Sequence, residues 1–241
     1  MRVALVSGGS RGIGAAIARR LARDGIRVVI TYASAADRAQ EVVAAINAAG
    51  GEAVAVRAEA TDPAALRAAV QRAVEVFGRV DILVNNAGVA PFGPVEQVTL
   101  EELDRTMAIH ARASFLLAQA VVPVMGAGGR IVNIGSSLVE RVPYGGWTLY
   151  AMSKSSLVGL TKGLARELGP RGITVNLVHP GSTDTEMNPA DGPDAEEERA
   201  FTALGRYLDP EDVAETVAHL AGPGGRNITG AAFLVDAGTV A

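Results

Sequence analysis

The sequence predicts a doubly wound α/β fold, in which a seven-stranded parallel sheet carries helices on both faces. Short apolar, β-branched runs alternate with longer Ala-rich stretches of helical period along the whole chain. The composition agrees, because 49% of the residues are hydrophobic and only 4% are aromatic, as is typical of buried parallel strands under Ala-rich helices. The 241 residues suffice for one large domain but are few for two, so we expect residues 1–241 to form a single domain.

The individual elements follow from this alternation. Strands are expected over residues 3–7, 28–32, 53–57, 82–85, 131–134, 174–178 and 233–235. Helices are expected over 13–23, 35–48, 63–77, 100–125, 150–168 and 210–221. Several of these helices end at a glycine, the residue that most easily closes a helix. Repeated strand–helix–strand units imply right-handed crossovers, which place helices on both faces of the sheet.

A polar segment interrupts the alternation after the sixth strand. Residues 188–202 read NPADGPDAEEERAFT, an acidic stretch with two prolines. Such a stretch forms either a solvated surface loop or a mobile lid, since long loops inside compact domains are often functional. Its position after the sixth strand favours a substrate lid over residues 188–204.

Composition also excludes several classes of function. The formal net charge is −4 and no block of Lys or Arg occurs, so neither nucleic acid nor a membrane surface is an expected partner. The chain has no cysteine, which excludes disulfides, thiolate catalysis and Cys-ligated zinc, and we expect no metal site. The first residues form a short apolar run unlike a signal peptide, and no later run approaches membrane-spanning length. We therefore expect a soluble cytoplasmic protein that acts on a small molecule.

The first strand leads directly into a glycine-rich turn. Residues 7–14 read SGGSRGIG and open a helix. Glycines permit a tight turn and a close backbone approach, and a helix N-terminus offers free N–H groups to a pyrophosphate. The spacing is G-x-x-x-G-x-G, and Ile17 stands where the common dinucleotide fingerprint has its third glycine. Alone, the motif fits either a Rossmann-type dinucleotide site or a tight turn without a ligand.

The end of the second strand indicates which dinucleotide would bind. NAD sites of this architecture usually place an acidic residue there to bind the ribose 2′-hydroxyl. Here the strand ends with Tyr32, Ala33 and Ser34, and the first carboxylate is Asp37. Arg11 in the glycine loop is either a surface arginine or a partner for a 2′-phosphate, which a carboxylate would repel. Together these features favour NADP(H).

A tyrosine and a lysine one helical turn apart supply candidate acid–base chemistry. Tyr150 and Lys154 share one face of a predicted helix, downstream of a strand that ends NIGSS at residues 133–137. The other motifs, in chain order, are NNAG at 85–88, HPG at 179–181 with Thr185, NITG at 227–230 and VDAG at 235–238. In this combination the chain resembles the short-chain dehydrogenase/reductase family, particularly its β-ketoacyl-carrier-protein reductase-like members, over essentially its whole length.

The resemblance implies a catalytic role for Tyr150, Lys154 and a serine. Tyr150 would protonate a carbonyl oxygen as hydride arrives, or accept the alcohol proton in the reverse direction, while the serine hydrogen-bonds the same oxygen. Lowering a tyrosine pKa by about three units takes roughly 4 kcal/mol, which a Lys154 cation about 4 Å away would supply. The strand alignment selects Ser136 as the serine, and the usual serine-to-tyrosine spacing selects Ser137. We prefer Ser136, because the loop that follows accommodates an extra residue more easily than a buried strand end does.

Two residues depart from the family pattern. His110 stands where the family usually has an Asn that holds a proton-relay water, so it is either a relay residue or a structural histidine. An imidazole titrates near pH 6.5 when unperturbed and would add an ionisation to the rate profile. Glu59 stands where relatives usually have Asp near the adenine, a change that would weaken or lengthen that contact. The resemblance also implies that Asn85 ties the central strands together.

The remaining site residues also follow from the resemblance. It implies a cofactor site made by the loops after the first, second, third, fourth and sixth strands and by the catalytic pair: Gly8, Ser10, Arg11, Gly12, Ile13, Gly14, Tyr32, Ser34, Glu59, Asn86, Ala87, Gly88, Tyr150, Lys154, Pro180, Gly181, Thr183 and Thr185. The substrate pocket is expected from residues 90–94, 138–148 and 188–204, and Tyr144 and Trp147 indicate an apolar site.

The resemblance thus predicts an NADPH-dependent oxidoreductase that reduces a ketone, 3-oxoacyl-like or a related carbonyl, to an alcohol. The same core accepts many substrates. An alcohol, polyol or steroid-type dehydrogenase and a catalytically idle NADPH-binding protein therefore stay open as alternatives. Family members are mostly tetramers built on the helices that carry His110 and Tyr150, which implies a homotetramer.

Overall fold

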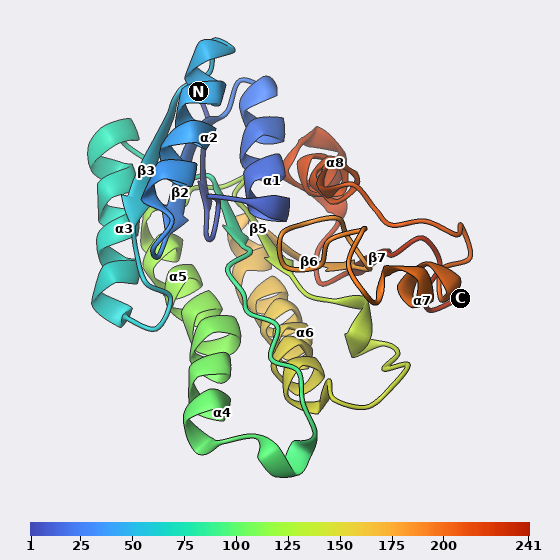
Figure 1. Ribbon diagram of the computed structural model, residues 1–241. Helices are drawn as coiled ribbons and strands as arrows, with labels where there is room; N and C mark the ends of the chain where they lie inside the picture. Colours follow the sequence, from blue (N-terminus) through green and yellow to red (C-terminus); the bar gives the residue numbers. More distant parts are fainter.

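The computed structural model describes residues 1–241 and consists of a seven-stranded sheet between two layers of helices (Figure 1). All neighbouring strands are parallel, in the order β3-β2-β1-β4-β5-β6-β7. The strands are β1 (Val3–Val6), β2 (Arg27–Tyr32), β3 (Ala53–Arg57), β4 (Ile82–Asn85), β5 (Arg130–Ile134), β6 (Thr174–Pro180) and β7 (Ala232–Val235). The predicted doubly wound fold is confirmed.

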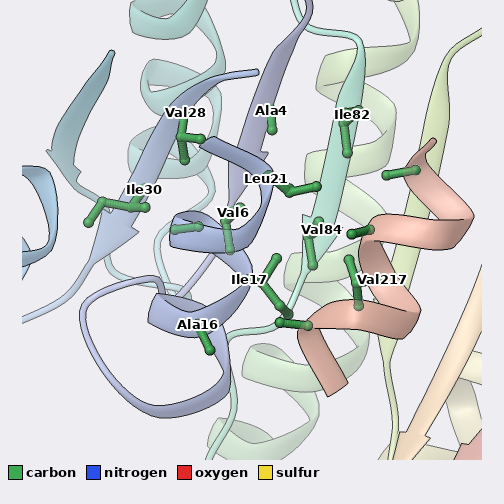
Figure 2. Packing of buried hydrophobic residues seen from close by; sticks show 14 of the residues in the cluster. Ala4, Val6, Ala16, Ile17, Leu21, Val28, Ile30, Ile82, Val84 and Val217 are labelled. Carbon is green, nitrogen blue, oxygen red and sulfur yellow. The ribbon is translucent and has the colours of Figure 1, made fainter. Parts of the chain in front are cut away.

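One face of the sheet is covered by α1 (Gly12–Arg23), α2 (Ala36–Ala48) and α8 (Pro210–Ala221). Helices α1 and α8 pack side by side (Figure 1). Figure 2 shows Ile17 and Leu21 of α1, and Val217 of α8, facing the apolar side chains of β1, β2 and β4. Ala-rich helices can lie this close to the sheet because their small side chains leave the branched strand residues to fill the space.

The other face is covered by α3 (Pro63–Phe77), α5 (Ala113–Val121) and α6 (Thr148–Leu168). Successive side chains of a strand point to opposite faces of the sheet, so each central strand packs against both helix layers. In β1, Ala4 and Val6 pack against the first layer and Leu5 against the second. This double burial explains why the strands appear in the sequence as continuous apolar runs.

Two predicted segments differ in detail from the structure. The helix expected over 100–125 is divided into α4 (Leu100–Met107), a π-helical segment (Ala108–Arg112), α5 and a 3-10 turn (Val122–Val124). The segment expected as a lid contains a short helix, α7 (Ala195–Ala200). The other short turns are 3-10 helices at Val95–Gln97, Ser137–Val139, Gly169–Arg171 and Pro223–Asn227. Single-turn features of this kind carry too weak a period to be read from sequence.

The helical run Leu100–Val124 has the length and hydropathy of a membrane span, contrary to the expectation that no run approaches them. Its parts pack against α3 and α6, and 44% of its most apolar window is buried within the protein. A core helix meets the same criteria of length and composition, so these criteria alone are weak grounds for assigning a span.

Candidate active site

The loops that follow β1, β4, β5 and β6 surround a cavity of about 870 Å³ at the carboxyl edge of the sheet. Ligands in doubly wound sheets bind at this edge, where the strand order reverses. The residues predicted to bind the cofactor all line the cavity: Gly8, Ser10, Arg11, Gly12, Ile13, Gly14, Tyr32, Ser34, Glu59, Asn86, Ala87, Gly88, Tyr150, Lys154, Pro180, Gly181, Thr183 and Thr185. Ser136 also lines it, whereas His110 does not.

The glycine loop is so closely packed that side chains would not fit. A Cβ on Gly8, where φ is +65°, would lie 2.9 Å from Cα of Ala87, and one on Gly14 would lie 2.3 Å from the Gly8 carbonyl oxygen. The Ser7 hydroxyl accepts hydrogen bonds from the N–H groups of Asn86 (2.9 Å) and Ala87 (3.1 Å). The Asn86 amide donates in return to the carbonyls of Ser7 (3.0 Å) and Gly8 (3.1 Å). These bonds hold the loops after β1 and β4 together.

Helix α1 begins without a side-chain cap. Arg11 occupies the N-cap position and makes no capping hydrogen bond, so the first N–H groups of α1 are free to bind an anion. The exposed Arg11 side chain lines the same cavity. This end of the site therefore offers backbone donors, the positive end of a helix dipole and a guanidinium to the phosphates of a dinucleotide.

The end of β2 has no carboxylate in the cavity. Tyr32 and Ser34 line it there, and the Arg57 side chain crosses the strand end, its Nε donating to the Ala33 carbonyl at 3.2 Å. Glu59 lines the cavity from the loop after β3. This strand end suits a ribose 2′-phosphate better than a 2′-hydroxyl, which is usually bound by an acid at this place.

Ser136, Tyr150 and Lys154 converge on the cavity from the end of β5 and the first turns of α6. Lys154 Nζ donates to the Ile134 carbonyl at 3.0 Å and lies 5.9 Å from the centre of the Tyr150 ring. The Ser136 hydroxyl accepts from the N–H of Leu138 at 3.2 Å and lies near enough to Tyr150 to lower its pKa. Ser137 lines the cavity as well, but it begins the 3-10 turn that Ser136 caps. The structure thus brings Ser136 to Tyr150.

Comparisons with known proteins agree with this geometry. Residues 8–240 match the family model described as enoyl-(acyl carrier protein) reductase. Over 235 residues, 98% of this chain and 95% of the relative, the chain is 42% identical to the cyclic-di-GMP-binding biofilm dispersal mediator protein of Escherichia coli. It is 39% identical over 242 residues, 99% of this chain and 97% of the relative, to the 3-oxoacyl-[acyl-carrier-protein] reductase of Synechocystis.

A solved structure extends the likeness to three dimensions. The short-chain dehydrogenase from Burkholderia cenocepacia, in complex with NADP, is 54% identical with a TM-score of 0.98, covering 100% of this chain and 98% of that one. The chain belongs to the short-chain dehydrogenase/reductase family. The predicted family, the Rossmann-type fold and the oxidoreductase class are therefore confirmed.

In this short-chain dehydrogenase/reductase, burial decides the protonation of the catalytic pair. Burial raises the pKa of Tyr150, and the nearby Ser136 hydroxyl offsets only part of the rise. Burial lowers the pKa of Lys154 to about 8. In the protein alone, desolvation of the phenolate is the largest influence on the Tyr150 pKa, so the lowering expected from Lys154 does not set its direction. At neutral pH Tyr150 is therefore protonated and Lys154 is mostly cationic.

Both ring nitrogens of His110 bind protein groups. Nε2 accepts from the N–H of Val89 at 3.0 Å, so Nδ1 carries the proton and donates to the Ser153 hydroxyl at 2.8 Å. Ser153 in turn donates to the Tyr150 carbonyl at 2.7 Å. The ring has no nitrogen left for a relay water, and its bonds connect the loop after β4 to the second turn of α6.

Burial, and to a lesser extent the charge of Lys154, lowers the pKa of His110 to about 2. The ring therefore stays neutral throughout the pH range in which enzymes are usually assayed. The expectation that His110 adds an ionisation near pH 6.5 to the rate profile is wrong, because protonation would place an unpaired charge in a buried position.

Sequence reasoning missed two residues that position the catalytic groups. His179 is fully buried, and its Nδ1 accepts from the N–H of Ser136 at 3.0 Å. Its ring also explains Gly135, where a Cβ would lie 2.4 Å from the same nitrogen. Ser153 bridges His110 and Tyr150. His179 belongs to the HPG motif and Ser153 lies between Tyr150 and Lys154, but their hydrogen bonds are made with groups far away in the sequence.

The neutral state of His110 predicts the pH dependence of stability. Below about pH 6.5 the unfolded chain protonates this histidine and the folded protein does not, so stability falls as the pH drops. His110→Asn is expected to weaken that fall between pH 7 and pH 5, by up to about 1.4 kcal/mol per pH unit. Urea unfolding at each pH measures the effect.

The matched control is His219→Asn, since His219 is exposed. The acid limb of kcat against pH should keep its wild-type shape in His110→Asn. An unchanged pH dependence of unfolding, or an altered acid limb, would show that His110 titrates in the folded protein.

Proposed function

We propose that the protein is an NADPH-dependent reductase that converts a ketone to an alcohol with Tyr150 as its acid. One observation carries the proposal: the hydroxyl groups of Tyr150 and Ser136 adjoin each other in a cavity that also holds Lys154 and the glycine loop. Two converging hydroxyl groups fit a carbonyl oxygen, which accepts two hydrogen bonds. The relative named as a 3-oxoacyl reductase and the neighbour bound to NADP support it.

The protonation states favour reduction. NADPH, when bound, supplies the hydride. Ser136 hydrogen-bonds the carbonyl oxygen and orients it toward Tyr150, whose raised pKa keeps the proton that the oxygen needs. Lys154 holds its charge beside the Tyr150 ring, where it stabilises the phenolate that forms after proton transfer. Oxidation of an alcohol would instead need a phenolate at the start, so the reverse rate should rise with pH.

The glycine loop would hold a dinucleotide, and its Arg11 favours NADP(H) over NAD(H). The free N–H groups at the start of α1 would hold the pyrophosphate, and Arg11 would reach a 2′-phosphate at the end of β2, where no acid competes. Pro180, Gly181, Thr183 and Thr185 would hold the nicotinamide side.

Cofactor choice depends on Arg11 in this proposal. NADPH should give a higher kcat/KM than NADH, and Arg11→Ala should reduce that preference by about 1 to 3 kcal/mol, as for the loss of a charged hydrogen bond. Arg23→Ala, an exposed arginine at the other end of α1, is the control and should leave the preference unchanged. Equal use of NADH and NADPH by the unmutated protein would remove the cofactor assignment.

The catalytic roles predict a clear ranking of variants. Tyr150→Phe should lose most turnover and still bind NADPH, because only the proton donor is gone. Ser136→Ala should lower kcat far more than Ser137→Ala, since Ser136 is the serine beside Tyr150. Steady-state kinetics and NADPH fluorescence titration measure the two effects. The reverse ranking of the serines would overturn the assignment of Ser136.

The alternative functions predict different results. An alcohol, polyol or steroid-type dehydrogenase would turn over alcohols near neutral pH in preference to ketones. A catalytically idle protein would bind NADPH and turn over neither ketones nor alcohols. One relative is named for binding cyclic-di-GMP and not for a reaction, so turnover has to be tested beside NADPH binding. The alignment of Ser136, Tyr150 and Lys154 in one cavity supports an active enzyme.

Copies of the chain would pair through the α4, α5 and α6 face. A groove there is lined by Met107, Ala111, Phe115 and Leu160, and Phe115 is 51% exposed. This face would carry the tetramer contacts that the resemblance implied, and a single-chain mass in solution would exclude them. The cytoplasmic location stays a prediction.

A further inference from the structure

Aromatic rings from three separate segments line the substrate side of the cavity. The ring centre of Trp147 lies 5.5 Å from that of Tyr150, and the ring centre of Phe92 lies 4.9 Å from that of Trp147. Tyr144 stacks on Phe201 of the lid segment (residues 188–204), with ring centres 6.0 Å apart. A group that enters beside Tyr150 therefore meets ring faces and edges, which bind another aromatic ring well.

Phe92 is held in place although little covers it. It lines the cavity and is 63% exposed. A Cβ on Gly146 would lie 2.4 Å from the Phe92 ring, and the Gly146 carbonyl accepts from the N–H of Gly93 at 3.0 Å. The loops that carry Phe92 and Trp147 are thus joined at this point. A bound apolar group would cover ring surface that otherwise faces water, which is favourable.

The lid segment contributes only negative charges to the cavity. Asp194, Glu197 and Glu198 line it. Burial is the main cause of the raised pKa of Tyr144, and the charges of all three carboxylates raise it further. They therefore lie within electrostatic range of the aromatic wall, which is formed by Phe92, Tyr144 and Trp147. Glu198 is also fixed, because it accepts from the Asn188 amide at 2.7 Å and from the Tyr207 hydroxyl at 2.9 Å.

The nearby arginines are bound elsewhere and do not neutralise this charge in the cavity. Arg199 donates to the Ala190 carbonyl and lies over the Tyr207 ring. Arg141 donates to the Thr239 carbonyl at 2.7 Å. The arginines that do line the cavity are Arg11 of the glycine loop and Arg105 of α4, and neither belongs to the lid segment or to the aromatic wall. An anionic group on the substrate would face the carboxylates of the lid segment, and no arginine there would be available to pair with it.

We propose that the substrate is a ketone with an aromatic ring next to its carbonyl and with no negative charge. The ring packs among Phe92, Trp147 and Tyr144 while the carbonyl oxygen meets Tyr150 and Ser136. The carboxylates of the lid segment disfavour an anion and favour a neutral or cationic substituent. This inference rests on the proposed ketone reduction and narrows its substrate to aryl ketones without a negative charge.

A matched set of ketones tests the charge preference. The set comprises acetophenones that carry a para ethyl, trimethylammoniomethyl or carboxymethyl group, with cyclohexyl methyl ketone as the non-aromatic comparison. With NADPH, kcat/KM for the cationic ketone should exceed that for the carboxylate by about tenfold, the size of one charge–charge interaction across a partly solvated cavity. A carboxylate ketone that reacts as well as the cationic one overturns the proposal.

Single variants locate the effect. Asp194→Asn and Glu197→Gln should each lower the cation-to-carboxylate ratio of kcat/KM several-fold. Glu196→Gln is the control on the same helix, since its side chain is 96% exposed and does not line the cavity, and it should leave the ratio unchanged. Phe92→Leu, which stays apolar but loses the ring, should lower the preference for the ethyl acetophenone over the cyclohexyl ketone. Unchanged ratios in these variants contradict the proposal.

Binding separates this inference from the proposed function. Trp147 is the chain's one tryptophan, so its emission reports directly on aryl ligands beside Tyr150. The ketones are titrated into the NADP⁺ complex, where no hydride is available. If no ketone is reduced but the cationic acetophenone binds more tightly than the carboxylate, the proposed function fails and the inference on ligand class stands. If ketones are reduced but the acetophenones bind with equal affinity whatever their charge, the inference alone fails.

Discussion

The site depends on the close approach of two backbones where the strand order of the sheet reverses. β1 and β4 are neighbours, and the chain proceeds outward from them in opposite directions, to β2 and to β5. The loops that leave their carboxyl ends diverge and open a cavity between them. Ser7 and Asn86 hold these loops together by hydrogen bonds, and Gly8 and Gly14 leave no space that a side chain would need. The glycine loop is thereby shaped before any ligand arrives, and its free N–H groups are aimed into the cavity.

Burial then sets the chemistry of the groups placed around this opening. Tyr150 keeps its proton, Lys154 has a pKa of about 8, and His110 is neutral. Each state follows from the same cause, because a buried group resists becoming charged. His110 and His179 are held by hydrogen bonds to Val89, Ser153 and Ser136. These two histidines hold the segments that carry Tyr150 and Ser136, the acid and the carbonyl-binding serine of the proposed reaction, and they do so without carrying charge.

The fold was predictable because its strands are buried on both faces and its helices are Ala-rich. The strands therefore appear in the sequence as continuous apolar runs at regular spacing. The lining of the cavity was equally predictable, since most of the residues proposed for the cofactor follow strand ends in short motifs, and all of them line it. The role of His110 was not predictable. Its burial and its bond to Ser153 depend on the π-helical segment and on α6, 43 residues away. The raised pKa of Tyr150 was not predictable for a related reason, because a charge–charge estimate from spacing omits the cost of desolvation.

Transfer of isotope from cofactor to ketone tests the central claim most directly. NADPH carrying deuterium at either C4 position is incubated with an acetophenone and the protein, and the alcohol is analysed by mass spectrometry. The account predicts one deuterium at the carbinol carbon from one of the two C4 epimers only, since a bound nicotinamide would present a single face to a carbonyl held by Tyr150. It also predicts that no deuterium reaches that carbon from deuterated water. A carbinol hydrogen that comes from solvent, or from both epimers equally, would contradict hydride transfer in this site.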